Sequence, residues 1–435
     1  MKDLLIKKIQ DKTAVLGVIG LGYVGLPLAV EKAKMAYKTI GFDVQEQKVD
    51  MVNAGQNYIG DIVPEELTCV VASGRLTATK DFSFIQDVDC VAICVPTPLD
   101  IYQQPDVSYV IQSTEDIASY LHPGMLIVLE STTYPGTTEE IVKPILEKTG
   151  LKVGQDIYLA FSPERVDPGN QLYNTKNTPK VVGGVTSDCT EVAATLYENI
   201  LEGKVERVSS PAVAEMEKIL ENTFRNINIG LANEMAILCH KMGIDVWEVI
   251  EAAKSKPYGF MPFYPGPGVG GHCIPIDPFY LTWKAREYGY HTRLIETAGE
   301  INNYMPEFVL ERSMKILNRF GKALKNSNIL ILGVAYKQDI DDVRQSPALH
   351  VISHLEANGA SVSYHDPFVG DFTLNNKEYR SIALTAEVLQ DADLVIVTTM
   401  HTEYDYEFIQ KHARMIFDTK NAFKNIVNRD NIEKL

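Results

Sequence analysis

A cysteine and an aspartate stand four residues apart in an unusual stretch of this chain. The segment GPGVGGHCIPIDP, residues 266–278, is too rich in glycine and proline to form a helix or a regular strand. Cys273 therefore lies in a loop where backbone can approach a bound molecule, and a polar loop can give its thiol the thiolate character of a nucleophile. A buried structural thiol is the competing interpretation. His272 either tunes the thiol or shapes the loop.

A lysine and an asparagine form a second candidate pair. Lys218 and Asn222 lie four residues apart in the segment 211–243, whose apolar positions recur with helical spacing, so they share one face of the predicted helix. Arg225 and Asn226 extend this polar stripe. An ammonium and an amide on one face can stabilise an oxyanion, whereas the alternative is an ordinary solvated helix face.

A glycine-rich turn predicts a phosphate-binding loop. Gly20, Gly22 and Gly25 form GLGYVG, which follows an apolar run, opens a helical pattern and precedes a strand that ends at Asp43. The glycines allow a tight turn, close approach of backbone to a pyrophosphate, and helix–strand packing, while the helix N-terminus favours the phosphate charge. Asp43 would accept hydrogen bonds from a ribose diol and repel a 2′-phosphate, which favours NAD over NADP.

Two further turns follow predicted strands. Pro96 and Thr97 belong to the turn PTP, and Thr132 belongs to STTYPGT. In doubly wound sheets the carboxyl ends of strands are where ligands bind, although ordinary loop chemistry explains such turns equally well.

The order of elements predicts the fold class. Buried runs at 14–20, 88–96, 125–132 and 157–164 read as strands separated by helical patterns, which is typical of a mostly parallel sheet covered on both faces. A long helical region follows, and residues 244–300 continue largely helical apart from the cysteine loop. The chain is therefore predicted to be α/β, with two Rossmann-like doubly wound domains joined by a long central helix and a helical middle domain.

An internal similarity supports the second α/β domain. The strand pattern restarts at 327–337 and 361–367, and QDVDCVAICVPTPLD (86–100) resembles QDADLVIVTTMHTEY (390–404). The second copy lacks GxGxxG, so we expect it to bind something other than an intact dinucleotide in that manner.

Composition excludes several classes of partner. The chain has 435 residues, 45% of them hydrophobic and 23% charged, with a formal net charge of −16, so nucleic acid and anionic membranes are not expected partners. The N-terminus has no signal-peptide pattern, and no apolar run is long enough to span a bilayer. The six scattered cysteines give no zinc-ligand spacing, so no metal is expected, and they favour a reducing, cytoplasmic setting.

Together these motifs resemble a known family, the UDP-sugar 6-dehydrogenases, which includes the UDP-glucose and UDP-N-acetylmannosamine dehydrogenases. The resemblance covers nearly the whole chain, through GLGYVGLPLA, STTYPGT, SPER, AEMEKILENTFR, GPGVGGHCIPIDP, GVAYKQDIDDVRQSP, YHDP and FDTKN. Within the family, PFYPGPGVGGHCIPIDPFYLTWKARE looks most like the UDP-N-acetylglucosamine 6-dehydrogenase branch.

This resemblance implies an NAD-dependent, four-electron oxidation of UDP-N-acetyl-D-glucosamine at C6. The product would be UDP-N-acetylglucosaminuronic acid for surface polysaccharide biosynthesis, formed through a thiohemiacetal and a thioester on the cysteine. UDP-N-acetyl-D-mannosamine and UDP-glucose are alternative substrates for the same mechanism. A single-step β-hydroxyacid dehydrogenase and a non-enzymatic NAD-binding regulator are alternatives of other classes.

The resemblance also implies an organisation and a set of site residues. It divides the chain into an NAD-binding domain (1–205), a central helical domain with the cysteine loop (206–310) and a UDP-binding domain (311–435), and it implies a homodimer or larger homo-oligomer. The implied catalytic residues are the nucleophile Cys273, the oxyanion pair Lys218 and Asn222, and Asp277, Glu164 and Thr132 near the reacting carbon and its water. The implied cofactor contacts are Gly20, Gly22, Tyr23, Val24, Gly25, Asp43, Lys48, Pro96, Thr97, Thr132 and Arg344. The implied substrate contacts are Glu164, Arg165, Val166, Lys218, Asn222, Tyr264, Gly268, Gly270, Lys337 and Lys420.

One residue departs from the family pattern. Lys420 stands in FDTKN where many relatives carry an arginine that contacts the substrate, and lysine cannot make the planar two-pronged contact of arginine. The segment AAKSKPYGF likewise has no clear match for the family's arginine from the neighbouring subunit.

Overall fold

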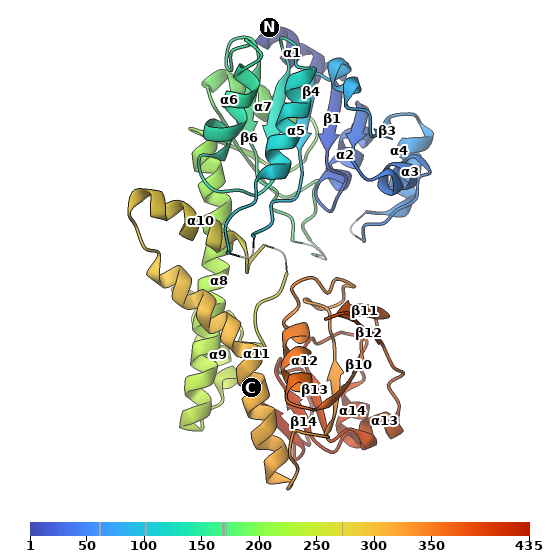
Figure 1. Cartoon of the computed structure of the whole chain (residues 1–435), viewed down its shortest axis with the longest axis vertical. Helices are drawn as coiled ribbons and strands as arrows, with labels where there is room; N and C mark the ends of the chain where they lie inside the picture. Colours follow the sequence, from blue (N-terminus) through green and yellow to red (C-terminus); the bar gives the residue numbers. More distant parts are fainter. Residues whose placement is uncertain (61, 101, 168–169, 171, 272) are drawn as a thin grey trace. The chain divides into compact units, whose positions relative to one another are not determined.

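The chain folds into two compact units. The computed structural model describes all residues except 61, 101, 168, 169, 171 and 272 (Figure 1). The first unit contains Met1–Glu221 and Trp283–Tyr290, and the second contains Asn222–Thr282 and His291–Leu435. The helix α8 (Pro211–Met242) is continuous, as the spacing of its apolar residues predicts, and the division between the units falls within it.

The first unit is built on an eight-stranded sheet. The strand order is β3-β2-β1-β4-β5-β6-β7-β8, and every neighbouring pair is parallel except β6 and β7, which are antiparallel. The order β3-β2-β1-β4-β5-β6 is that of a dinucleotide-binding doubly wound sheet, which confirms the predicted fold class. The strands are β1 (Val15–Ile19), β2 (Lys38–Phe42), β3 (Leu76–Thr79), β4 (Cys90–Ile93), β5 (Leu126–Leu129), β6 (Tyr158–Phe161), β7 (Lys180–Gly184) and β8 (Val205–Val208).

Helices cover this sheet and complete its core. α2 is buried along nearly its whole length because it packs against β1, β2 and α4. α7 begins after Thr186, whose hydroxyl accepts a hydrogen bond from the Cys189 amide at 3.2 Å, and it packs on β6, β7 and β8. The helical segments are α1 (Lys2–Gln10), α2 (Gly25–Lys34), α3 (Glu46–Asn53), α4 (Pro64–Ala72), η1 (Phe82–Asp87), α5 (Ser108–Ser119), η2 (Thr138–Val142), α6 (Lys143–Glu147) and α7 (Ser187–Glu198).

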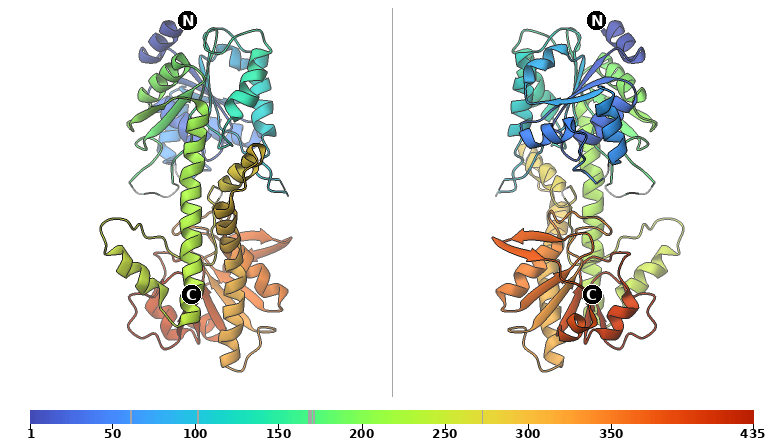
Figure 2. Two further views of the ribbon diagram at one scale, coloured as in Figure 1. Left: turned by 90° about the vertical axis from the view of Figure 1, so that its left-hand side faces the viewer. Right: turned by 90° about the vertical axis from the view of Figure 1, so that its right-hand side faces the viewer.

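The second unit contains a five-stranded parallel sheet in the order β10-β9-β13-β14-β15. A two-stranded antiparallel hairpin, β11–β12, lies beside β10 and extends from the sheet (Figure 2). The strands are β9 (Asn328–Leu332), β10 (Ser361–His365), β11 (Asp371–Leu374), β12 (Lys377–Arg380), β13 (Leu394–Val397), β14 (Ile416–Asp418) and β15 (Ile432–Lys434). Its order is the second common arrangement of doubly wound sheets.

The helices of the region 244–300 are interrupted by a long irregular segment. Between the end of α9 and the start of α10, the described residues of 255–276 contain no helix, because proline and glycine are frequent there. The expectation of a largely helical region is therefore right only for its two ends. The remaining helices are α9 (Val246–Lys254), α10 (Asp277–Ala285), η3 (Arg286–Tyr288), α11 (Arg293–Arg319), α12 (Pro347–Ala357), α13 (Ala386–Asp391) and α14 (Tyr406–His412).

The two sheets repeat one arrangement around their first strands. β1 pairs with β2 and β4, and β9 pairs with β10 and β13, all in parallel. Gly20 after β1 and Gly333 after β9 both have positive φ, 90° and 83°. Each donates its amide hydrogen to the last residue of the neighbouring strand, Phe42 at 2.8 Å and His365 at 3.0 Å. The similarity between 86–100 and 390–404 thus corresponds to equivalent strands, β4 and β13.

Among the described residues, no helix has the combination of length and apolar character that crossing a bilayer requires.

Candidate active site

The glycine loop between β1 and α2 has the three properties that a pyrophosphate site requires. A Cβ on Gly20 would lie 2.5 Å from the Cys94 carbonyl oxygen, and a Cβ on Gly25 would lie 1.8 Å from the Gly20 carbonyl oxygen. At Gly22, by contrast, no described atom lies within 4 Å of the place of a Cβ. The first and third glycines permit a tight turn and close helix–strand packing, while the second leaves the backbone open to a ligand. The N-terminus of α2 adds a favourable dipole.

Asp43 lies beside this loop at the end of β2. Its carboxylate accepts hydrogen bonds from the backbone amides of Leu21 and Gln45, both at 2.9 Å, and its side chain is almost fully buried. The Lys48 ammonium lies 3.6 Å from the same carboxylate. The structure therefore brings together the two residues that the sequence assigns to the adenosine ribose.

The turns after β4 and β5 meet through hydrogen bonds. The Thr97 hydroxyl donates to the Thr132 carbonyl at 2.6 Å, and the Ser131 hydroxyl donates to the Val95 carbonyl at 2.8 Å. Pro96, Thr97 and Thr132 thus belong to one cluster at the carboxyl edge of the sheet, where the sequence predicts them.

Glu164 follows β6 and lies over a buried ion pair. One carboxylate oxygen accepts the amide hydrogens of Arg165 and Val166, each at 2.8 Å, and the other lies 3.8 Å from the Lys180 ammonium. Lys180 donates to the Glu130 carboxylate at 2.6 Å. Burial by itself lowers the pKa of Lys180, but Glu130 and Glu164 outweigh burial and leave that pKa raised.

The first turns of α8 present charged side chains to the segment after β6. The Arg165 guanidinium forms ion pairs with Glu221 and with Glu217, the latter at 3.3 Å. The pKa of Glu217 is raised to about 7, because burial disfavours its charge and Glu221 repels it. Lys218 is only 8% exposed, yet its ammonium donates no hydrogen bond to another described residue. An ammonium in that state is available to a bound anion.

Cys273 is exposed, which removes the interpretation of a buried structural thiol. Its carbonyl accepts the amide hydrogens of Ile276 at 3.1 Å and Asp277 at 2.8 Å, which form the turn that leads into α10. His272 lies outside the described residues.

Two asparagines of α8 hold this turn. The Asn222 amide donates to the buried Asp277 carboxylate at 2.6 Å, and the Asn226 amide donates to the Ile274 carbonyl at 3.1 Å. Asn222 therefore orients Asp277, a contact that its sequence assignment as an oxyanion donor does not include.

The glycines of the cysteine loop pack closely against the chain itself. A Cβ on Gly268 would lie 2.9 Å from Pro347, and a Cβ on Gly270 would lie 2.8 Å from both Pro347 and Tyr336. The sequence assigns these glycines to close contact with a sugar, but the close contact they make in the structure is with the segment after β9 and the start of α12.

Lys420 lies on the first glycine of the same loop. A Cβ on Gly266 would lie 2.7 Å from the Lys420 ammonium, and the Gly266 amide is held by Asn233 at 3.0 Å. Burial lowers the pKa of Lys420 to about 8. Lys420, which stands where many relatives carry an arginine, thus lies against the loop that carries Cys273.

Three other assigned residues have different surroundings. The Tyr264 hydroxyl donates to Glu251 of α9 at 2.6 Å, and its ring stacks on Trp247. Arg344 belongs to the second unit, where its guanidinium binds the Asp342 carboxylate at 2.7 Å. Lys337 is half-buried in the loop after β9. All three belong to the second unit.

Sequence reasoning missed several residues that support the site. Glu130 and Lys180 form the buried pair beneath Glu164, and Asn226 and Asn233 fix the two ends of the cysteine loop. The only signal for Glu130 is a charged residue at the end of the apolar run MLIVLEST. Among the described residues, no group of three or more His, Cys, Asp or Glu side chains could hold a metal ion.

Comparison with known proteins assigns all three parts of the chain to one family. Residues 14–201 match the NAD binding domain of the UDP-glucose/GDP-mannose dehydrogenase family, residues 212–304 its central domain, and residues 330–425 its UDP binding domain.

Individual relatives match over nearly their full length. The chain is 35% identical over 412 residues to a UDP-N-acetyl-D-glucosamine 6-dehydrogenase of Salmonella typhi, covering 93% of this chain and 95% of the relative. It is 38% identical over 435 residues to a UDP-N-acetyl-D-mannosamine dehydrogenase of Methanocaldococcus jannaschii, covering 96% and 93%. The solved UDP-D-ManNAc dehydrogenase from Pyrococcus horikoshii superposes with a TM-score of 0.88 at 32% identity, covering 97% and 98%.

Proposed function

The chain belongs to the UDP-glucose/GDP-mannose dehydrogenase family, and we propose that it oxidises C6 of UDP-N-acetyl-D-glucosamine to a carboxylate. Members of this family are NAD-dependent UDP-sugar dehydrogenases. The observation that carries the proposal is the exposed Cys273 on a turn that Asn222 and Asn226 hold from α8. An exposed thiol fixed in this way suits covalent chemistry on a carbonyl group.

The residues around β1 fit the cofactor. The open backbone at Gly22 and the N-terminus of α2 would hold the pyrophosphate. Asp43 accepts two backbone hydrogen bonds, and a carboxylate has about four acceptor sites, so it retains capacity for the ribose hydroxyls. When bound, NAD⁺ supplies the acceptor for each hydride that leaves C6.

Cys273 explains how one site carries an alcohol to an acid. The first oxidation removes a hydride and a proton from the alcohol and gives an aldehyde. The Cys273 sulfur then bonds to the aldehyde carbon, and the carbonyl oxygen takes up a proton, giving a thiohemiacetal. This species loses a second hydride and proton and becomes a thioester. Water then breaks the carbon–sulfur bond, which releases the carboxylate and restores the thiol.

The surrounding residues have separable roles in this sequence. The Lys218 ammonium, which donates no hydrogen bond to another described residue, would stabilise the oxyanion that forms at each addition. Asp277, oriented by Asn222, would accept a proton from the attacking water. Glu164, held by two amides and by Lys180, would position that water.

The choice of N-acetylglucosamine rests on the resemblance of residues 262–287 to that branch of the family. The curated relatives include enzymes named for UDP-N-acetylglucosamine and for its C2 epimer UDP-N-acetylmannosamine at similar identity, so the epimer is the second candidate. We also propose that the chain forms a homodimer, as argued below from α8.

Stoichiometry tests the proposal directly. Purified enzyme is incubated with NAD⁺ and limiting UDP-N-acetylglucosamine, UDP-N-acetylmannosamine, UDP-N-acetylgalactosamine or UDP-glucose, and NADH and sugar acid are measured. We expect the highest kcat/KM with UDP-N-acetylglucosamine, and two NADH for each sugar consumed. Preference for the epimer would correct the sugar alone, whereas one NADH for each sugar would exclude the four-electron reaction.

A matched pair of cysteine variants completes this test. Cys273→Ser should form little or no acid, because its hydroxyl is a poor nucleophile. Cys69→Ser, which alters the other exposed cysteine, should match the wild type. Full acid production by Cys273→Ser would exclude the thioester route.

A further inference from the structure

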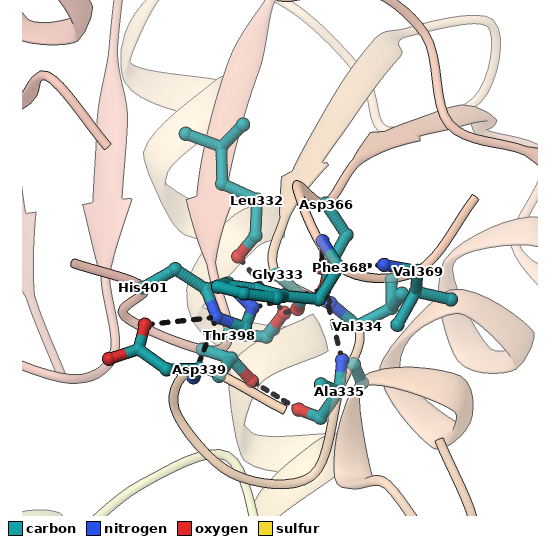
Figure 3. Close-up of polar contacts among 12 residues, drawn as sticks. Leu332, Gly333, Val334, Ala335, Asp339, Asp366, Phe368, Val369, Thr398 and His401 are labelled. Carbon is teal, nitrogen blue, oxygen red and sulfur yellow. Dashed lines mark hydrogen bonds and ion pairs between the residues drawn. The ribbon is translucent and has the colours of Figure 1, made fainter. Parts of the chain in front are cut away.

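The imidazole of His401 joins two segments at the carboxyl edge of the second sheet (Figure 3). The ring follows β13 and is fully buried. Its Nδ1 accepts the backbone amide hydrogen of Asp339 at 3.0 Å, and its Nε2 lies 3.1 Å from the Asp366 carboxylate. Because an amide only donates and a carboxylate only accepts, both contacts are satisfied by the neutral tautomer with its hydrogen on Nε2.

Asp366 is the counterpart of Asp43, but its carboxylate is fully occupied. Besides His401, it accepts the amide hydrogens of Val334, Ala335, Phe368 and Val369 at 2.6, 3.1, 2.9 and 3.1 Å. Among the described residues, Asp43 accepts the amide hydrogens of two. Since a carboxylate has about four acceptor sites, Asp366 has none left for a ribose. In the second sheet this position therefore anchors the loop after β9.

The loop after β9 (333–344) is fixed at a second point by His401. Asp339 has φ of 60°, a left-handed conformation that residues other than glycine seldom adopt. Its amide hydrogen is held by His401, and its carboxylate accepts the Thr402 amide at 2.8 Å. Lys337 lies between this point and the anchor at Val334 and Ala335. The path of the backbone through Lys337 is thus set by Asp366 on one side and His401 on the other.

We propose that His401 is a positioning residue for binding of the uridine diphosphate group, acting through the hydrogen bond from Asp339 to its Nδ1. The bond holds the loop in the conformation that directs Lys337 to the diphosphate, and His401 itself makes no contact with the substrate. This inference rests on the proposed function and on the expectation that Lys337, within the residues 330–425 that match the family's UDP binding domain, binds the nucleotide part of the substrate.

Two substitutions of His401 test its contacts with Asp339 and with Asp366 separately. In His401→Asn, the amide oxygen can take the place of Nδ1 and accept from Asp339, while the contact with Asp366 is lost. In His401→Gln, the amide nitrogen can take the place of Nε2 and donate to Asp366, while Asp339 loses its acceptor. The proposal requires the first contact and not the second, so the two variants should behave differently.

The measurement is the affinity of the full-length protein for UDP, by calorimetry. We expect His401→Gln to weaken UDP binding roughly ten-fold, the effect of leaving one buried donor unpaired. His401→Asn should regain affinity to within about two-fold of the wild type. With substrate, the Gln variant should show a raised KM and a nearly unchanged kcat, and both variants should bind NAD⁺ as the wild type does. Amide exchange at 336–342 should accelerate in the Gln variant alone.

Several outcomes would overturn the inference. Equal loss of UDP affinity in both variants would mean that His401 only stabilises the fold, and unchanged affinity in both would mean that the loop does not need it. If the Gln variant does not fold, a folded Asn variant with ten-fold weaker UDP binding contradicts the inference, whereas near-normal affinity together with slow exchange at Asp339 supports it. A wild-type protein that reduces NAD⁺ with no UDP-sugar and binds no UDP would instead refute the proposed function, and the inference would fall with it.

Discussion

At the scale of single residues, the surroundings of Lys420 predict a pH dependence of substrate binding. Its ammonium lies against Gly266, and burial lowers its pKa to about 8. Below that pH the side chain is charged and attracts an anionic substrate, and above it the attraction is lost. We therefore expect kcat/KM for the UDP-sugar, which reports the free enzyme, to fall with rising pH through a pKa near 8. Because a bound anion favours the charged lysine, kcat at saturation should fall only at higher pH.

The arginine found in many relatives provides the control for this prediction. In Lys420→Arg the guanidinium stays charged, so the decline near pH 8 should disappear. In Lys420→Met the affinity should be low throughout the pH range. An unchanged decline in Lys420→Arg would assign the titration to another group and remove Lys420 from substrate binding.

Individual residue types predict their own chemistry better than they predict their partners. The glycine loop and Asp43 are predicted from type and spacing, because they are tied to a local backbone feature, whereas Lys48 and the role of Cys273 as nucleophile are predicted from the resemblance to the family. Glu130 and Lys180 were not predicted, because they are distant in the sequence and meet only when β5 and β7 join one sheet. The contact of Asn222 with Asp277 was not predicted either, because these two residues are also distant in the sequence.

At the scale of elements, α8 has an exposed apolar stripe. Phe224, Leu231 and Leu238 are seven residues apart and 46%, 54% and 46% exposed, and Met242 continues the row at 62%. A seven-residue repeat keeps side chains on one face of a helix, as in helices that pair with another helix. We expect this stripe to be the interface of a homodimer, so Leu231→Glu should convert the dimer into a monomer in sedimentation experiments.

A polar position of the same helix gives the matched variant. Arg225→Glu introduces the same side chain at an exposed position about 100° around the helix from Phe224, outside the stripe, and should leave the oligomer intact. The prediction is contradicted if Leu231→Glu remains dimeric, or if the wild type is itself a monomer at micromolar concentration.

Some strands and helices can be predicted from the sequence and others cannot. The central strands β1, β4, β5 and β6 are continuous apolar runs and were predicted, because parallel strands are buried on both faces. β8 at the edge of the first sheet has one buried residue among its four and was not predicted. The division between the units within α8 also has no local signal, because helical spacing continues across it.

At the scale of the whole molecule, each unit has its own sheet and its own hydrophobic core. The core of the first unit surrounds the eight-stranded sheet, and separate clusters line the two faces of the five-stranded sheet. The first sheet carries the glycine loop, whose backbone is open at Gly22. In the second sheet, Asp366 stands at the position of Asp43, and His401 binds its carboxylate. The repeated arrangement therefore predicts different ligands for the two units, although their first strands and glycines are equivalent.

Amide hydrogen exchange can assign each ligand to its unit. NAD⁺ alone should slow exchange at residues 20–26 and 43–48, and UDP alone should slow exchange at 333–344. A ligand at 100 times its Kd stabilises the bound form by about 2.7 kcal/mol, so amides that exchange only after the ligand dissociates should slow by up to about 100-fold.

Residues 126–129 of β5 provide an internal reference, because a central buried strand should exchange slowly with either ligand. Protection of 333–344 by NAD⁺ without protection of 20–26 would place the cofactor on the second sheet, contrary to the geometry of the two loops. Protection of each loop by its own ligand alone would mean that the same strand arrangement binds a dinucleotide in the first unit and a nucleoside diphosphate in the second.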